Sequence, residues 1–211
     1  MSVYKTVFDR NMYRVKSLCA LYNSLKTNEA KESKEYKFTD ILRSAIVFLH
    51  SSFEEYFRNV LRDVLPNTCT QEDLKKISFT TKDGRHIDKL TVGNLLQYKG
   101  KTVDDLVAGF IGDTLDTTSF NNYVDIVSWA KKINVDLSTF TSQEKIEKMI
   151  MRRHKIVNEA DNSRTDKMNN SYSLTVIFES VVNEWINAVQ NLVNIIDSQI
   201  EGEINNVSIQ V

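Results

Sequence analysis

The side chains best suited to chemistry lie between residues 152 and 161, whose sequence is R-R-H-K-I-V-N-E-A-D. Two guanidiniums, an imidazole, an amide and a carboxylate are therefore carried by a short stretch of one predicted helix. Arginine presents a planar fork of donors that matches phosphate oxygens, and histidine exchanges a proton near neutral pH. We expect this segment to handle a phosphate group.

Helical periodicity gives the segment a buried face. At 3.6 residues per turn, the apolar residues of the helix fall on one side, which we expect to be packed against the rest of the protein. These residues are Ile146, Met149, Ile150, Ile156, Val157 and Ala160. Arg153 projects into the middle of this face. His154, Asn158 and Asp161 follow one flank of it, and Arg152 lies on the other flank.

A guanidinium in a buried position needs a partner, because an unpaired buried charge costs several kcal/mol. For Arg153 the sequence offers Glu54, Glu55 or Asp161 as the carboxylate of a structural ion pair. The alternative is a phosphate brought by a ligand. The geometry of the helix leaves both interpretations open.

The segment resembles the signature of the HEPN superfamily, all-α domains that include many metal-independent ribonucleases of prokaryotic defence and toxin systems. The signature is an arginine, a polar residue, a short spacer and a histidine. Arg153 matches the arginine and His154 the polar residue, so the histidine should stand at position 158. This chain has Asn158 there. The surroundings are similar to the subgroup that reads R-R-H-x-I-V-H-x-A-D.

The resemblance implies a fold, a reaction and partners. The fold is an all-α, HEPN-like helical bundle with a helical insertion. In HEPN ribonucleases the arginine and histidine of two protomers converge in a cleft, where the RNA 2′-hydroxyl attacks the adjacent phosphate without a metal or cofactor. The implied partners are RNA, a second copy of the chain, and an antitoxin or other defence-system protein. The implied site residues are Arg153, Asn158 and His154 for catalysis, Arg152 and Lys155 for RNA binding, and Glu54 and Asp161 in support.

Asparagine at position 158 changes the chemistry that we expect. Its amide can hydrogen-bond a phosphate or ribose, but it has no accessible pKa and cannot act as general acid or base. Losing one proton-transfer group costs about 10²- to 10⁴-fold in rate. We therefore expect the chain to bind RNA better than it cuts it. Natural degeneration and recent or deliberate inactivation are both open, and the intact residues around Asn158 favour the second.

Composition sets the wider limits. With 211 residues, 41% hydrophobic and 26% charged, the chain suits a single domain, and a net charge of −1 restricts RNA binding to a local, salt-sensitive cleft. The two cysteines, Cys19 and Cys69, suggest neither disulfides nor zinc, so we expect a reducing cytoplasm. Three scattered histidines make a metal site improbable. No apolar stretch is long enough to cross a membrane.

The coarse map has one domain over residues 1–201, with a variable insertion at 67–140 and a flexible tail at 202–211. A hairpin is expected within 78–90, around Asp83-Gly84, and polar linkers at 28–37 and 162–171. A capping box at Thr141–Glu144 should begin the helix that carries the motif. The other expected helices cover residues 3–26, 39–65, 103–115, 121–133 and 173–200, with Pro66 ending the second.

Beside the apolar stripe of the second helix, His50, Glu54 and Arg58 recur every four residues. They form either a solvated face or the border of the Arg153 pocket. For the whole protein three functions stay open: a disabled RNA-cleaving effector, a non-catalytic RNA-binding HEPN protein, and a helical dimerisation scaffold.

Overall fold

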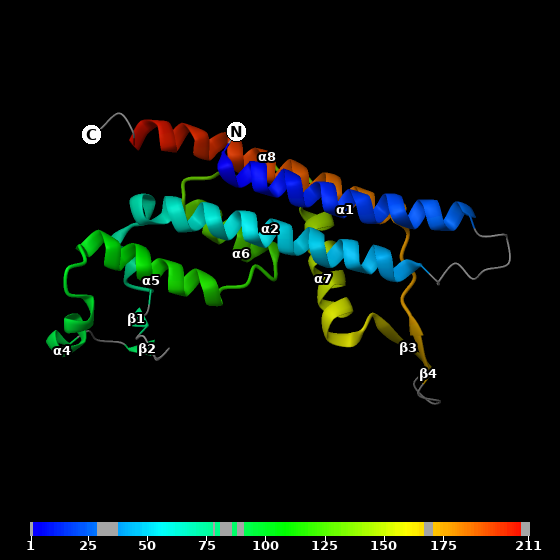
Figure 1. Cartoon of the computed structure of the whole chain (residues 1–211), viewed down its shortest axis with the longest axis horizontal. Coiled ribbons are helices and arrows are strands. Elements are labelled where there is room, and N and C mark those ends of the chain that lie inside the picture. Colours follow the sequence, from blue (N-terminus) through cyan, green and yellow to red (C-terminus); the bar gives the residue numbers. More distant parts are fainter. Residues whose placement is uncertain are drawn as a thin grey trace.

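Three long helices form the body of the molecule: α1 (Val3–Asn28), α2 (Thr39–Thr68) and α8 (Glu179–Val207). The computed structural model describes residues 2–28, 38–77, 79–80, 86–87, 91–166 and 171–207. In Figure 1 the three helices run side by side, with α1 and α8 covering one side of α2. The predicted all-α architecture is confirmed.

The central helix α2 is held by the apolar stripe that its sequence predicted. Leu42, Ile46, Leu49, Phe53 and Phe57 are all fully buried. Several buried side chains of this size, at roughly 1.5–3 kcal/mol each, anchor the helix far more strongly than its intrinsic propensity does. Phe53 stacks on Phe57, with ring centroids 5.6 Å apart. The core therefore follows α2 along its length.

The prediction that Pro66 ends α2 was wrong, because the helix continues to Thr68. Buried Leu65 holds this last turn on the core, and the hydroxyl of Thr68 donates to the carbonyl of Val64 at 3.1 Å. Pro66 has no backbone N–H to donate, but the loss of this one hydrogen bond does not outweigh the contacts of the final turn.

The segment predicted as an insertion packs below α2 (Figure 1). It contains α3 (Gln71–Leu74), β1 (Phe79–Thr80), β2 (His86–Ile87), α4 (Val92–Leu95), the 3₁₀ helix η1 (Leu96–Tyr98), α5 (Val103–Thr117) and α6 (Tyr123–Lys132). The predicted hairpin is confirmed, since Phe79 pairs with Ile87 and Thr80 with His86 in antiparallel register. Its expected Asp83-Gly84 turn lies outside the described residues. Ile111, Phe120 and Ile126 are fully buried and join the same core as α2.

Helix α7 (Gln143–Glu159) crosses α2, and its second half projects away from the bundle (Figure 1). Ile146, Met149 and Ile150 in its first half are buried, as predicted. In the second half the prediction holds only for Ile156, which is partly buried against the core. It was wrong for Val157, which is 52% exposed, and for Ala160, which is also exposed. Periodicity located the correct face of the helix but not the point where that face leaves the core.

The predicted capping box at the start of α7 does not form. Ser142 is the N-cap residue, and its side chain makes no capping hydrogen bond. The backbone of Ser142, at φ −102° and ψ 29°, is not the extended conformation that aims a cap hydroxyl into the first turn. Capping boxes form instead at Thr70, Thr91 and Thr102, which begin α3, α4 and α5.

The predicted polar linker at 162–171 is largely a hairpin of β3 (Asn162–Asp166) and β4 (Ser171–Leu174). Backbone pairing holds this ribbon without an alternating apolar pattern, so composition alone indicated a loop. As a result α8 begins at Glu179 and not near residue 173, and it reaches Val207, inside the predicted tail. Among the described helices, none is long and apolar enough to span a bilayer.

Candidate functional site

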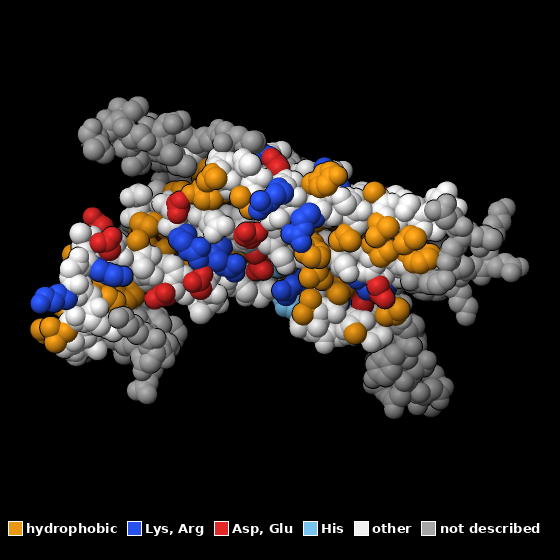
Figure 2. Space-filling model, in the orientation of Figure 1, with side chains coloured by type: hydrophobic (Ala, Val, Ile, Leu, Met, Phe, Trp, Pro, Cys, Tyr) orange, Lys and Arg blue, Asp and Glu red, His pale blue; other side chains and the backbone are white. Residues whose placement is uncertain are grey.

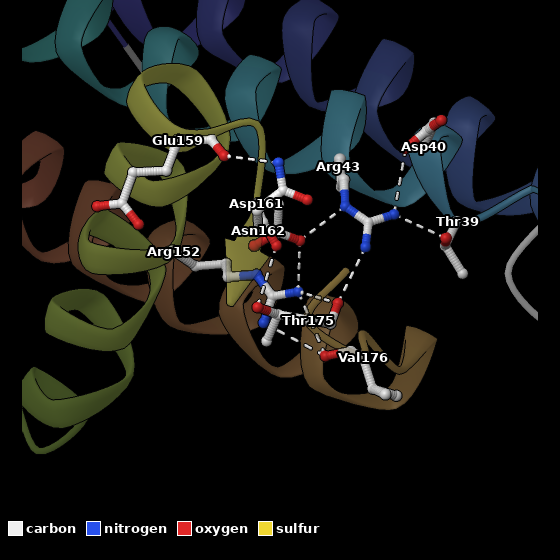
Figure 3. A network of polar contacts seen from close by, with 9 residues as sticks. All are labelled: Thr39, Asp40, Arg43, Arg152, Glu159, Asp161, Asn162, Thr175 and Val176. Atoms are coloured by element: carbon white, nitrogen blue, oxygen red, sulfur yellow. Dashed lines mark hydrogen bonds and ion pairs between the residues drawn. The ribbon is translucent and has the colours of Figure 1, made fainter. Parts of the chain in front are cut away.

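The C-terminal end of α7 is fastened by a buried carboxylate held between two arginines (Figure 3). Asp161 is fully buried, and its Oδ2 accepts from Arg43 Nε at 2.6 Å and from Arg152 Nη2 at 2.7 Å. Arg43 Nη1 donates to the hydroxyl of Thr39 and to Oδ1 of Asp40, at 2.7 and 3.2 Å. The other Nη atoms of the two arginines donate to main-chain carbonyls. Arg43 and Arg152 both donate to the carbonyl of Thr175, at 2.9 and 2.8 Å.

The backbone turns sharply to deliver Asp161 to these arginines. Ala160 and Asp161 both adopt left-handed conformations, with φ of 48° and 58°. The amide of Asp161 donates to the carbonyl of Lys155 at 3.0 Å, and the amide of Thr175 donates to the carbonyl of Asp161 at 3.0 Å. This turn therefore brings α2, the end of α7 and the residue that follows β4, Thr175, together at one point.

The turn separates Asp161 from the residues with which the sequence grouped it. Because the helix ends at Glu159, Asp161 no longer follows His154 and Asn158 along one flank. Arg152, expected to bind RNA, has donors engaged by Asp161 and by the carbonyls of Thr175 and Val176. Sequence reasoning missed Arg43, although an arginine beside the apolar stripe of α2 was the same signal that singled out Arg153.

Arg153 differs from Arg152 in its partners, although both are half-buried and the Nε atom of each is shielded from solvent without a hydrogen-bond partner. Among the described residues it makes no ion pair, so the predicted pairing with Glu54, Glu55 or Asp161 is not found. Glu54 instead accepts from the backbone amide of Phe120 at 3.1 Å. A guanidinium without a counter-ion among the described residues is available to an anionic ligand.

His50 lies beside this arginine and is completely buried. Its Nδ1 is 3.5 Å from Oε2 of Glu54, and neither ring nitrogen makes a well-formed hydrogen bond within the described chain. Burial lowers the pKa of His50 below its usual 6.5, and the charges of Arg153 and His154 lower it further. Glu54 and the backbone of Phe120 act in the opposite direction. The predicted polar strip on α2 is thus partly internal and faces the motif helix.

The other motif residues lie closer to solvent. His154 and Lys155 are half-buried, and Asn158 is exposed one turn beyond His154. Asn158 makes no hydrogen bond within the described part of the chain, so its amide is free to meet a ligand. Arg153, His154 and Asn158 therefore lie together in the C-terminal half of α7. The ion pair of Arg152 with Asp161 holds the end of this helix in place.

The comparison with protein families identifies the family of the chain. The family model described as RiboL-PSP-HEPN matches residues 9–202. The chain belongs to the RiboL-PSP-HEPN family. The searches of curated proteins and of solved structures gave no match. Membership of this family supports the HEPN resemblance of the chain, and the match spans α2 and α7 and most of α1 and α8.

For this HEPN protein the buried histidine predicts a pH-dependent stability. A histidine whose pKa is lowered in the folded state favours the neutral ring, and the unfolded chain binds its proton more readily. The stabilisation is therefore present above the ordinary pKa of about 6.5 and is lost as the pH falls toward the lowered value. We expect urea unfolding to show a fall in stability from pH 7.5 to pH 5, reduced in the variant His50→Gln. An identical pH dependence in both proteins would contradict this assignment.

Proposed function

We propose that the chain is a metal-independent RNA endonuclease effector or toxin of a prokaryotic defence or toxin–antitoxin system, with catalysis impaired at Asn158. The observation that carries this proposal is Arg153, a half-buried guanidinium without a counter-ion in the part of the chain that the structure describes, on the helix whose sequence resembles the HEPN motif. A phosphodiester would supply the negative charge that no described residue pairs with Arg153. His154 lies beside it, and Asn158 occupies the position of the family's histidine.

The rigid mounting of α7 supports this role. Its first half is packed into the core through Ile146 and Met149, and its end is tied down by Asp161. A catalytic arginine must be held within a fraction of an ångström of its productive position, which a helix fixed at both ends provides. In this proposal Arg152 and Asp161 support the site from within, and Lys155 lies next to it.

We further propose that the protein acts as a homodimer. Apolar side chains gather over the N-terminal half of α2 and the adjoining part of α7 (Figure 2). Phe48, Met151 and Val157 are 41%, 63% and 52% exposed. Covering this surface with a second copy would bring two motif helices together, as the family resemblance implies. An antitoxin or other defence protein is a further partner of the same surface.

The direct experiment is RNA binding by fluorescence anisotropy in EDTA, with the original chain and the variant Arg153→Gln. A charge-assisted hydrogen bond to phosphate contributes about 1.5–3 kcal/mol, so we expect a loss of affinity of roughly tenfold or more. The matched control is Arg62→Gln, a half-exposed arginine of the same helical body that pairs with Asp116. Equal affinity of Arg153→Gln and Arg62→Gln would contradict the proposal.

A second candidate function is RNA binding without cleavage. It is favoured by Asn158, whose exposed amide can hold a ribose or phosphate but cannot transfer a proton. In that case affinity still depends on Arg153, and restoring a histidine at position 158 leaves RNA intact. Absence of RNA binding altogether would favour the dimerisation scaffold.

A further inference from the structure

A groove runs between the N-terminal half of α2 and the C-terminal half of α7. It holds about 370 Å³, within the range of about 300–1,000 Å³ that is usual for small-molecule sites. Its walls come from Ser44, Val47 and Phe48 of α2 and from Ile156 and Ala160 of α7. Because Arg153, Ile156 and Ala160 are spaced i, i+3 and i+7, they share one face of the helix. The groove therefore begins about one helical turn from the Arg153 guanidinium.

The α2 wall of the groove carries an aromatic ring with a cation above it. The guanidinium carbon of Arg14, on α1, lies 4.9 Å from the centroid of the Phe48 ring. Phe48 is still 41% exposed with the arginine in place. Arg14 is itself exposed. Aromatic rings and guanidinium planes are the surfaces on which proteins stack the bases of single-stranded nucleic acids.

The charges around the groove suit a strand with a negative backbone and apolar bases. Arg14 adjoins the α2 wall and Arg153 belongs to the helix of the α7 wall, and neither makes an ion pair among the described residues. Arg43, which is buried at the base of the groove, is neutralised by Asp161. Unpaired cations beside the groove can therefore bind phosphates, while its interior accommodates a base.

We propose that this groove binds one nucleobase of a single-stranded RNA, stacked on the ring of Phe48. The inference rests on the proposed function and deepens it, because it makes the substrate an unpaired strand. A base held in a duplex cannot leave its stack to enter the groove without a cost in pairing energy. The exposed Ser44 hydroxyl makes no hydrogen bond within the described part of the chain, so it is free to meet the edge of the base.

A second copy of the chain is the competing occupant, because Phe48 also belongs to the apolar surface over α2 and α7 (Figure 2). RNA supplies both a flat ring for Phe48 and negative charge for Arg14 and Arg153. An apolar protein surface supplies neither, and it would bury the two guanidiniums without counter-ions. The charges beside the groove therefore favour RNA.

The first experiment measures the affinity for a labelled single-stranded RNA by fluorescence anisotropy in EDTA. Phe48→Leu keeps an apolar side chain but removes the flat ring, so we expect a loss of about fivefold or more. Phe48→Tyr keeps the ring and should bind as the original chain does. The matched control is Phe178→Leu, at a residue that is 57% exposed and does not line the groove. Equal affinity of Phe48→Leu and Phe178→Leu, with both folded, would overturn the proposal.

Two further readouts separate stacking from attraction between charges. Phe48→Leu should leave the slope of log affinity against log salt concentration unchanged, whereas Arg153→Gln should reduce it by about 0.7, the contribution of one phosphate on a single strand. A set of RNAs in which one base at a time is removed should then locate the stacked base. At that position the original chain should lose about fivefold or more, and Phe48→Leu should lose little further. Equal losses in both proteins at every position would contradict stacking on Phe48.

The outcomes distinguish this inference from the proposed function. If Arg153→Gln weakens RNA binding but Phe48→Leu does not, the groove proposal alone fails. If Phe48→Leu weakens binding but Arg153→Gln behaves as Arg62→Gln does, the groove stands and the phosphate site at Arg153 fails. If Phe48→Leu changes only the sedimentation of the protein, the groove is an interface between copies and the proposal is overturned. Absence of all RNA binding would overturn both.

Discussion

Asn158→His should convert the chain into a ribonuclease that cuts RNA about 10²- to 10⁴-fold faster than the chain with Asn158. The substitution adds the proton-transfer group that the HEPN resemblance implies for this position. Asn158 is exposed and unbonded within the described residues, so a ring at this place disturbs no existing contact. The measurement is cleavage of labelled RNA in EDTA, where a metal-dependent contaminant would be silent.

Two controls make this prediction specific. Asn158→Gln adds length without a usable pKa and should leave cleavage at the starting level. The double variant Asn158→His/Arg153→Ala should lose the gain, because no guanidinium then stabilises the charge of the transition state. If folded Asn158→His cuts no faster than the original chain, the disabled-nuclease proposal fails.

Asp161→Asn should lower the free energy of unfolding by about 3–5 kcal/mol. The two side chains have nearly the same shape, but the amide leaves Arg43 and Arg152 without the buried carboxylate that both contact. For a protein of this length the loss corresponds to roughly 10 °C in Tm. Urea unfolding at pH 7.5 measures it directly.

The matched control is Asp116→Asn, which removes the same charge from the exposed ion pair with Arg62. Exposed pairs contribute little, so the expected change is under about 1 kcal/mol. Equal effects of Asp116→Asn and Asp161→Asn would show that the buried network does not stabilise the end of α7.

Local patterns in the sequence predicted the parts of the fold that depend on local periodicity. The stripe from Leu42 to Val64 predicted a buried helix, and α2 is that helix. Periodicity also predicted the buried face in the first half of α7. It did not predict where α7 leaves the core, because that depends on the neighbours of Val157 and not on its own repeat.

The site was accessible from sequence only in part. The motif marked Arg153, His154 and Asn158 as one group, and the structure places them on the outward half of α7. The role of Asp161 depends on two consecutive left-handed residues, neither a glycine, so no turn signal announced it. Its partner Arg43 lies 118 residues away, and such a pairing arises only from the tertiary arrangement.

The burial of His50 was likewise hidden by its spacing. His50, Glu54 and Arg58 repeat every four residues, a pattern shared by many exposed ion-pair strips. The connection between α5 and α6 covers this strip. The backbone amide of Phe120 donates to Glu54, and the ring of Phe120 packs against that of Phe57, with the ring centroids 4.9 Å apart. Contacts from a segment so distant in sequence turned a surface pattern into an internal one.

The central claim is that Arg153 and position 158 form a site for attack by an RNA 2′-hydroxyl. The most direct test is to give Asn158→His two labelled RNAs in EDTA, one of them carrying 2′-deoxy sugars at the positions cut in the other. We expect cleavage of the all-ribose RNA with a 2′,3′-cyclic phosphate end, and no cleavage at the deoxy positions. Equal cleavage of both RNAs, or a 5′-phosphate and 3′-hydroxyl at the cut, would contradict the account.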